Sequence, residues 1–118
     1  MRPVDPVVRR RRAEQVSLID AARAWVDRLQ ERLPLDRAVI FGSVARGDFN
    51  RWSDVDLLLV SPAFHGPPLR RLEQLGDRPA RVQPVCWTPA EWRAERDRGN
   101  PIALEAETMG IGIEPGVG

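Results

Sequence analysis

Two short apolar segments, separated by a short and mostly polar stretch, constrain the fold of this chain more than any other feature. The first, residues 37–41, contains β-branched and aromatic residues and stops at Gly42-Ser43, which predicts a strand that turns directly into a short helix. The second, residues 54–61, is separated from that turn by ten residues. Its residues 57–60 are apolar at every position, as expected of a central strand covered on both faces of a sheet.

The remaining segments predict helices that pack against such a sheet. Apolar residues recur at helical spacing from about Val7 to Leu33, and Pro34 ends the pattern. Pro84 indicates that the strand expected over residues 81–87 lies at a sheet edge or contains a bulge. The other expected elements are helices over residues 69–75, 88–99 and 101–108, and strands over residues 81–87 and 111–113. This order predicts an α/β (α+β) fold in which helices flank a small mixed sheet.

Asp54 and Asp56 carry the most specific chemical signal. Residues at positions i and i+2 of a strand point to the same face, so the two carboxylates are expected to stand side by side. Adjacent carboxylates repel each other unless a cation lies between them. Because oxygen ligands of this kind suit Mg²⁺ or Mn²⁺, we expect both aspartates to bind a divalent metal.

The Gly42-Ser43 turn predicts the other half of such a site. A glycine lets the backbone approach an anion closely, and the N–H groups and the serine hydroxyl at a helix start suit a phosphate. Arg46 follows three residues later and is in reach of the same phosphates. All 18 basic residues are arginine, so the lysine of a Walker-type loop is excluded. Together with the aspartates, these residues predict a site for a metal–nucleoside triphosphate complex.

Residues 42–47 and 53–57 together resemble the signature of the minimal nucleotidyltransferases of the DNA polymerase β superfamily. The similarity spans about residues 15–114. It implies the nucleotidyltransferase (polymerase β-like) fold, with the glycine–serine turn on the triphosphate of ATP. It also implies that Asp54 and Asp56 are catalytic and bind the metals. A nucleoside monophosphate, AMP where ATP is the substrate, then passes to an acceptor hydroxyl and pyrophosphate leaves.

The same resemblance implies a partner. Members of this family often pair with a small helical HEPN protein as toxin and antitoxin, and in some pairs the nucleotidyltransferase attaches AMP to a tyrosine of the toxin. Because this chain has no Tyr, a tyrosine acceptor must lie on another protein.

One position departs from the family pattern. Active members usually carry a third carboxylate on a following strand, and the matching place here is at or near Gln83, whose amide brings no charge and is no base. Glu91 or Asp77 would have to replace it in space, although neither lies on the strand. An alternative hypothesis is therefore a catalytically weakened, nucleotide-binding antitoxin or regulatory subunit of a HEPN-type partner.

A length of 118 residues fits one domain. We expect a basic N-terminal arm over residues 1–12, with five arginines against one aspartate, and a single nucleotidyltransferase domain over residues 13–118. The arm alone suggests nucleic-acid binding, and a solvated helix start is the plainer interpretation. The chain lacks a membrane-length apolar run and a secretory signal pattern, from which we expect a cytoplasmic protein that does not use a membrane.

Several single residues complete the expectations. Cys86 is the only cysteine, which excludes an internal disulfide and a cysteine-cluster zinc site and predicts a buried structural thiol. Trp52 lies just before the aspartates, where a nucleotide, a partner or plain solvent are equally compatible with the sequence. The other tryptophans are predicted to be core or interface anchors: Trp25, Trp87 and Trp92.

Overall fold

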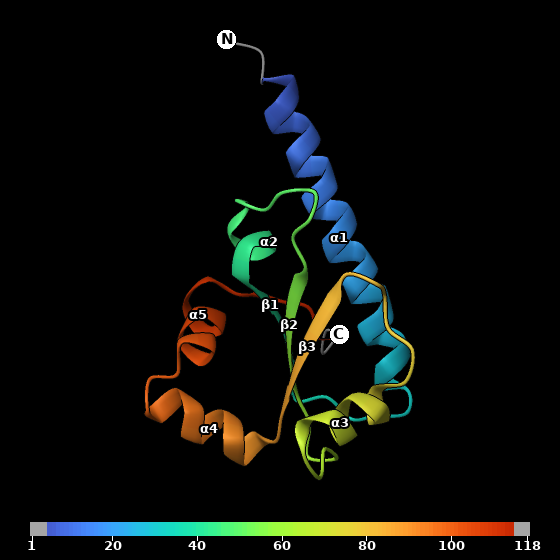
Figure 1. Cartoon of the computed structure of the whole chain (residues 1–118), viewed down its shortest axis with the longest axis vertical. Coiled ribbons are helices and arrows are strands. Elements are labelled where there is room, and N and C mark those ends of the chain that lie inside the picture. The colour runs from blue at the N-terminus through green and yellow to red at the C-terminus, as the bar shows by residue number, and fades with distance from the viewer. Residues whose placement is uncertain (1–4, 115–118) are drawn as a thin grey trace.

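The computed structural model of the chain describes residues 5–114 (Figure 1). Four of the five helices in this range have proline in their first turn, which suits the helix start because a first-turn N–H has no partner within the helix. In chain order the elements are α1 (Pro6–Gln30), β1 (Arg37–Phe41), α2 (Gly42–Arg46), β2 (Val55–Val60), α3 (Pro68–Leu75), β3 (Val82–Trp87), α4 (Pro89–Asp97), α5 (Pro101–Met109) and β4 (Ile111–Gly112).

The strands form one mixed sheet in the order β3-β2-β1-β4. Strand β1 runs antiparallel to both β2 and β4, and β2 runs parallel to β3. The predicted α+β fold with a small mixed sheet is confirmed, and Pro84 lies on the edge strand β3, where the missing N–H does not interrupt a ladder on both sides.

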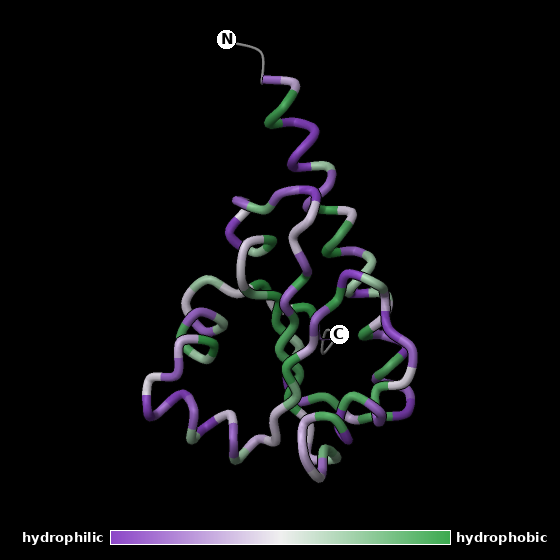
Figure 2. The backbone as a smooth tube through the Cα atoms, viewed as in Figure 1, coloured by the Kyte–Doolittle hydropathy of each residue, from purple (hydrophilic) through white to green (hydrophobic). Residues whose placement is uncertain are grey.

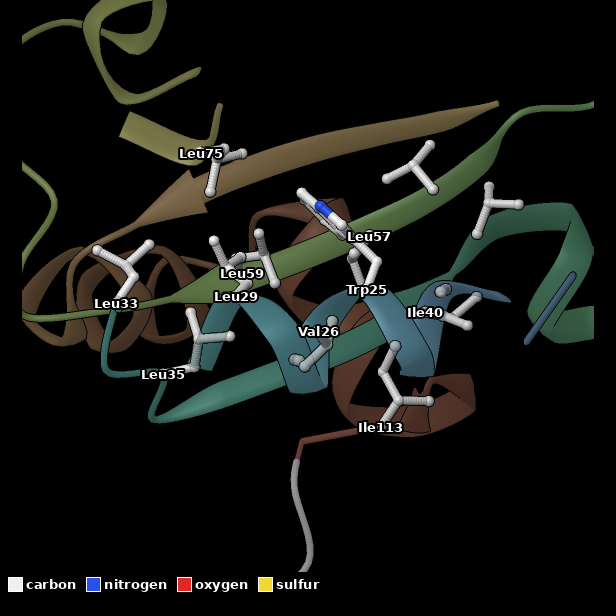
Figure 3. Packing of buried hydrophobic residues seen from close by; sticks show 14 of the residues in the cluster. Trp25, Val26, Leu29, Leu33, Leu35, Ile40, Leu57, Leu59, Leu75 and Ile113 are labelled. Carbon is white, nitrogen blue, oxygen red and sulfur yellow. The ribbon is translucent and has the colours of Figure 1, made fainter. Parts of the chain in front are cut away.

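Strand β2 is covered on both faces, as its apolar run predicts. Leu57 and Leu59 point into a core that they share with α1 and α3, whereas Leu58 and Val60 pack against α4 and α5. Figure 3 shows the first of these cores, with the apolar face of α1 lying on the sheet. The apolar strands lie at the centre of the molecule and the polar segments at its periphery in Figure 2. The sheet therefore divides the interior into two layers, one on each face.

Helix α1 is buried only in its second half. Its fully buried residues begin at Ala22, and residues 6–14 are all exposed. This first part projects beyond the sheet in Figure 1. The Asp5 carboxylate accepts a hydrogen bond from the N–H of Val7 at 2.7 Å and caps the helix start. Residues 6–12 of the basic arm are thus helical, and residues 1–4 lie outside the described range.

The end of α1 differs from the expected one. Regular helix stops at Gln30 rather than near Leu33, because the N–H groups of Glu31 and Arg32 bond three residues back and tighten the last turn. Leu33 is nevertheless buried in the core. Across residues 5–114, no helix is both long enough and apolar enough to cross a bilayer.

Candidate nucleotide- and metal-binding site

The turn between β1 and α2 brings the predicted phosphate-binding residues against the predicted metal-binding residues. Gly42 is buried and has a φ of 75°, a conformation that L side chains rarely adopt. A Cβ at Gly42 would overlap the Oδ2 atom of Asp56, the residue that pairs with Phe41 across the two strands. Glycine at this position therefore lets the backbone of the turn lie directly beside a carboxylate.

Ser43 lies in the first turn of α2 and is partly exposed. Helix α2 is only five residues long and ends at Gly47, so its dipole is small. Phosphate binding at this turn would therefore depend on individual N–H groups and the Ser43 hydroxyl rather than on the dipole of a long helix.

Asp56 stands on the sheet face that also carries Leu58 and Val60, at the end of β2 nearest α2, and Asp54 lies just before the strand. Burial raises the pKa of Asp56, and the negative charges of Asp54 and Glu105 raise it further. The charge of Arg46 acts in the opposite direction. The structure therefore brings Asp54, Asp56 and Gly42 together as the sequence predicts, in a place where negative charge is in excess.

Arg46 lies close to the aspartates but is already engaged. Its Nε atom donates to Oδ2 of Asp48 at 3.2 Å, and its Nη1 atom donates to Oε1 of Glu105. The hydrogen bond to Asp48, with the negative charge of Glu105, raises the pKa of Arg46. Arg46 must exchange at least one of these bonds before it binds a phosphate.

Glu105 is the residue of this site that the sequence did not reveal. It projects from α5, with 30% of its side chain exposed, and reaches Arg46 across the site. The only sequence signal is its place between Ala103 and Ala106, which are both buried. A carboxylate beside the buried stripe of a short helix indicates a charged partner nearby, but it does not identify that partner.

The third carboxylate of the family pattern is absent at the expected place. The register of β2 and β3 pairs Asp56 with Gln83, which is exposed. Asp77 does not replace it, because this residue lies on the α1 side, where its carbonyl oxygen accepts from Trp25 Nε1 at 2.9 Å.

Glu91 does not replace the missing carboxylate either. It caps α4 and accepts from Arg71, at distances of 2.5 and 3.2 Å. It follows the far end of β3, about 13 Å along the strand from Gln83 at the usual rise per residue. The suggestion that Asp77 or Glu91 stands in for the carboxylate is therefore wrong, and Glu105 is the acidic residue near Asp56 instead.

The residues of the site fit a divalent cation that is completed by another ligand. Among residues 5–114, no group of three or more His, Cys, Asp or Glu side chains is arranged to hold a metal. Two aspartates are nevertheless enough for Mg²⁺, which commonly takes one or two carboxylates and completes its shell with substrate phosphates and water. The backbone at Gly42 lies close enough to Asp56 that a ligand bound by the turn would stand next to this carboxylate.

The geometry of the site is thus a glycine–serine turn beside two aspartates at one end of a mixed sheet. Residues 23–98, which are 76 of the 118 in the chain, match the nucleotidyltransferase domain family. The chain belongs to this family.

A crystal structure of a candidate nucleotidyltransferase from Sulfolobus solfataricus has the same fold, with a TM-score of 0.63. The two sequences are 23% identical, and the match covers 86% of this chain and 84% of the other. No curated protein matches the sequence.

Proposed function

We propose that the protein is a metal-dependent nucleotidyltransferase that transfers AMP from ATP to an acceptor hydroxyl. One observation carries the proposal: the backbone of Gly42 lies directly against the carboxylate of Asp56. A phosphate held by the turn would therefore also reach a cation held by the aspartates. Catalysis in such a site consists mainly of positioning and charge neutralisation, which needs few side chains.

Each residue has a distinct role in this proposal. The N–H groups after Gly42 and the Ser43 hydroxyl bind the triphosphate, and Asp54 and Asp56 hold Mg²⁺ or Mn²⁺. A metal held by these aspartates would supply neutralisation of charge on the phosphate oxygens and would favour ionisation of the acceptor hydroxyl. In the transfer step the acceptor hydroxyl loses its proton to solvent water, its oxygen forms a bond to the α-phosphorus, the bond from that phosphorus to the bridging oxygen breaks, and pyrophosphate leaves. Arg46 gives up its hydrogen bond to Glu105 and donates to a phosphate oxygen instead.

The acceptor in this proposal lies on another molecule. A tyrosine hydroxyl within the chain is excluded because the chain has no Tyr. The resemblance to minimal nucleotidyltransferases supports a helical HEPN-type partner as the carrier of the hydroxyl, in a toxin–antitoxin pair.

A second candidate function rests on Gln83. Its pairing with Asp56 in the sheet leaves an amide where active relatives usually have a carboxylate, so no base from β3 is available to the acceptor hydroxyl. In this alternative the protein binds nucleotide and metal as a regulatory or antitoxin-like subunit without turnover.

Calorimetry with Mg²⁺ and ATP tests the binding step that both functions share. We expect heat of binding for the wild type and for Asp97→Asn, an exposed carboxylate on α4, and its loss in the double variant Asp54→Asn, Asp56→Asn. Equal binding by all three proteins would contradict the proposed site.

Transfer of label separates the two functions. The protein is incubated with α-labelled ATP and its native partner, and labelled protein is sought. Label on the partner supports the transferase. Absence of label from the wild type, together with transfer by Gln83→Asp, supports the regulatory subunit.

A further inference from the structure

Arginine side chains gather at the end of the molecule where α1 projects. Arg9, Arg10, Arg11 and Arg12 are all exposed in the first turns of this helix. Neither they nor Arg51 and Arg81, which lie beside the helix, form an ion pair with any residue of the range 5–114. Their positive charge is therefore not neutralised within the described part of the chain.

Three of these arginines line one groove of about 500 Å³. Arg10 comes from α1, Arg51 from the loop before the aspartates, and Arg81 from the residue before β3. The only acidic residue that lines the groove is Glu14. Arg81 is fixed in place because its guanidinium donates to the carbonyl oxygen of Ser53, with the Nε distance at 3.0 Å. Segments that are far apart in sequence thus build one basic groove, called the arginine groove below.

An exposed aromatic ring stands next to the arginine groove. Trp52 is 82% exposed, and the guanidinium carbon of Arg51 lies 5.7 Å from the centre of its ring. Trp25 and Trp92, by contrast, are buried. Covering such a ring with a ligand would be favourable because it removes apolar surface from water, and an arginine beside an aromatic ring is a common arrangement for stacking a nucleobase.

We propose that the arginine groove and Trp52 bind a single-stranded polynucleotide, with phosphates in the groove and one base stacked on the indole ring. Guanidinium groups from three segments line one groove and can neutralise several phosphates of one backbone. The exposed ring favours a single strand over a duplex, because only an unpaired base offers its face. This inference goes beyond the proposed function, because binding of the polynucleotide would require neither ATP nor a metal in the candidate active site.

Fluorescence anisotropy with the full chain and a short labelled single-stranded RNA tests the proposal, in buffer without ATP or divalent metal. We expect binding that weakens as salt rises, because counterions are released from the phosphates. In Arg10→Ala the negative slope of log K against log salt should become shallower by about 0.7, the contribution of one phosphate contact. Trp52→Ala should weaken binding roughly 5- to 160-fold, the equivalent of losing one stacked base, and Trp52→Phe should restore most of it.

The matched control is Arg93→Ala, which removes an exposed arginine from α4, away from the projecting part of α1. It should leave both the affinity and the salt slope unchanged. Equal loss in Arg93→Ala and Arg10→Ala would overturn the proposal, because binding would then follow total charge. Full affinity in Trp52→Ala, or equally tight binding of heparin, would also overturn it, because binding would then depend on negative charge alone.

Discussion

At the scale of single residues, Gly42 couples the turn to the aspartates. Gly42→Ala is expected to reduce binding of Mg²⁺ and ATP and to lower stability, because the new Cβ would overlap Asp56 Oδ2 and displace the carboxylate. The positive φ of 75° adds strain of about 1–2 kcal/mol. Urea denaturation measures the stability and calorimetry measures the binding.

Gly99 offers a matched control for this substitution. It has a φ of 76°, nearly that of Gly42, but a Cβ there would meet nothing within 4 Å. Gly99→Ala should therefore show the conformational strain alone and leave nucleotide binding intact. If the two variants lost the same stability and both bound normally, the contact between Gly42 and Asp56 would have no role in the site.

The charge of Asp56 gives a pH-dependent prediction. Its pKa is raised by burial first and by Asp54 and Glu105 second, so its ionised form is less stable in the folded chain than in the unfolded one. The wild type should lose stability as pH rises from the ordinary aspartate range through the raised pKa. Asp56→Asn does not titrate, and it should be more stable than the wild type at neutral pH, with the advantage shrinking in acid.

Urea denaturation at a series of pH values measures this difference, with Asp97→Asn as the control at an exposed position. A gain in Asp56→Asn no larger than in the control at neutral pH would be the contradictory result. The expected gain would mean that aspartate at position 56 lowers the stability of the folded chain, as functional residues often do.

At the scale of elements, local signals account for most of what the sequence predicted. The strand at 37–41 and the helix after it follow from an apolar run that stops at glycine. The start of α4 lies at a capping box, in which the side chains of Thr88 and Glu91 each accept from the other's N–H group. These signals act between residues a few positions apart, so they are readable without the tertiary structure.

The contact between Glu105 and Arg46 had no such local signal. The two residues are 59 positions apart, and they meet because α5 packs on the face of the sheet that carries Asp56. Which face a short helix covers depends on the packing of the whole core. The same limit applies to Glu91, whose hydrogen-bond partner Arg71 lies 20 positions away and cannot be identified from local sequence.

The capping box of α4 predicts the cost of two substitutions. Thr88 Oγ1 accepts from the N–H of Glu91 at 3.2 Å, and Glu91 Oε1 accepts from the N–H of Thr88 at 2.8 Å. Thr88→Ala removes the first bond and should cost about 1 kcal/mol of unfolding free energy. Glu91→Gln keeps the Oε1 acceptor of the box, but its amide nitrogen replaces Oε2, which accepts from Nη2 of the mostly buried Arg71, so it should cost at least as much as Thr88→Ala.

Urea denaturation compares these variants with Thr108→Ala, in which the lost hydroxyl donates to the Leu104 carbonyl oxygen on the exposed side of α5. Such a bond within a helix adds little stability, and the control should be close to the wild type. A loss in Thr108→Ala as large as in Thr88→Ala would show that the cap has no special value.

At the scale of the whole molecule, the two hydrophobic cores and the candidate site lie at different places along the sheet. Both faces of β2 are filled by apolar side chains from Leu57 onward, and the charged residues lie where the strand begins. The projecting part of α1 stands near this same end (Figure 1). Residues that bind ligands can thus change without opening either core.

This separation leads to a prediction for the complete protein. With only two aspartates to hold a cation, Mg²⁺ alone should raise the melting temperature little, and Mg²⁺ with ATP should raise it more than the two separate effects combined. At a hundredfold excess over Kd the complex adds about 2.7 kcal/mol, and each kcal/mol shifts Tm by about 4 °C in a domain of this size. Scanning calorimetry measures the shift in the wild type, in Asp54→Asn and in Asp97→Asn. The Mg²⁺-dependent part should vanish in Asp54→Asn and persist in Asp97→Asn, whereas a full shift with Mg²⁺ alone would mean that the protein itself completes the metal site.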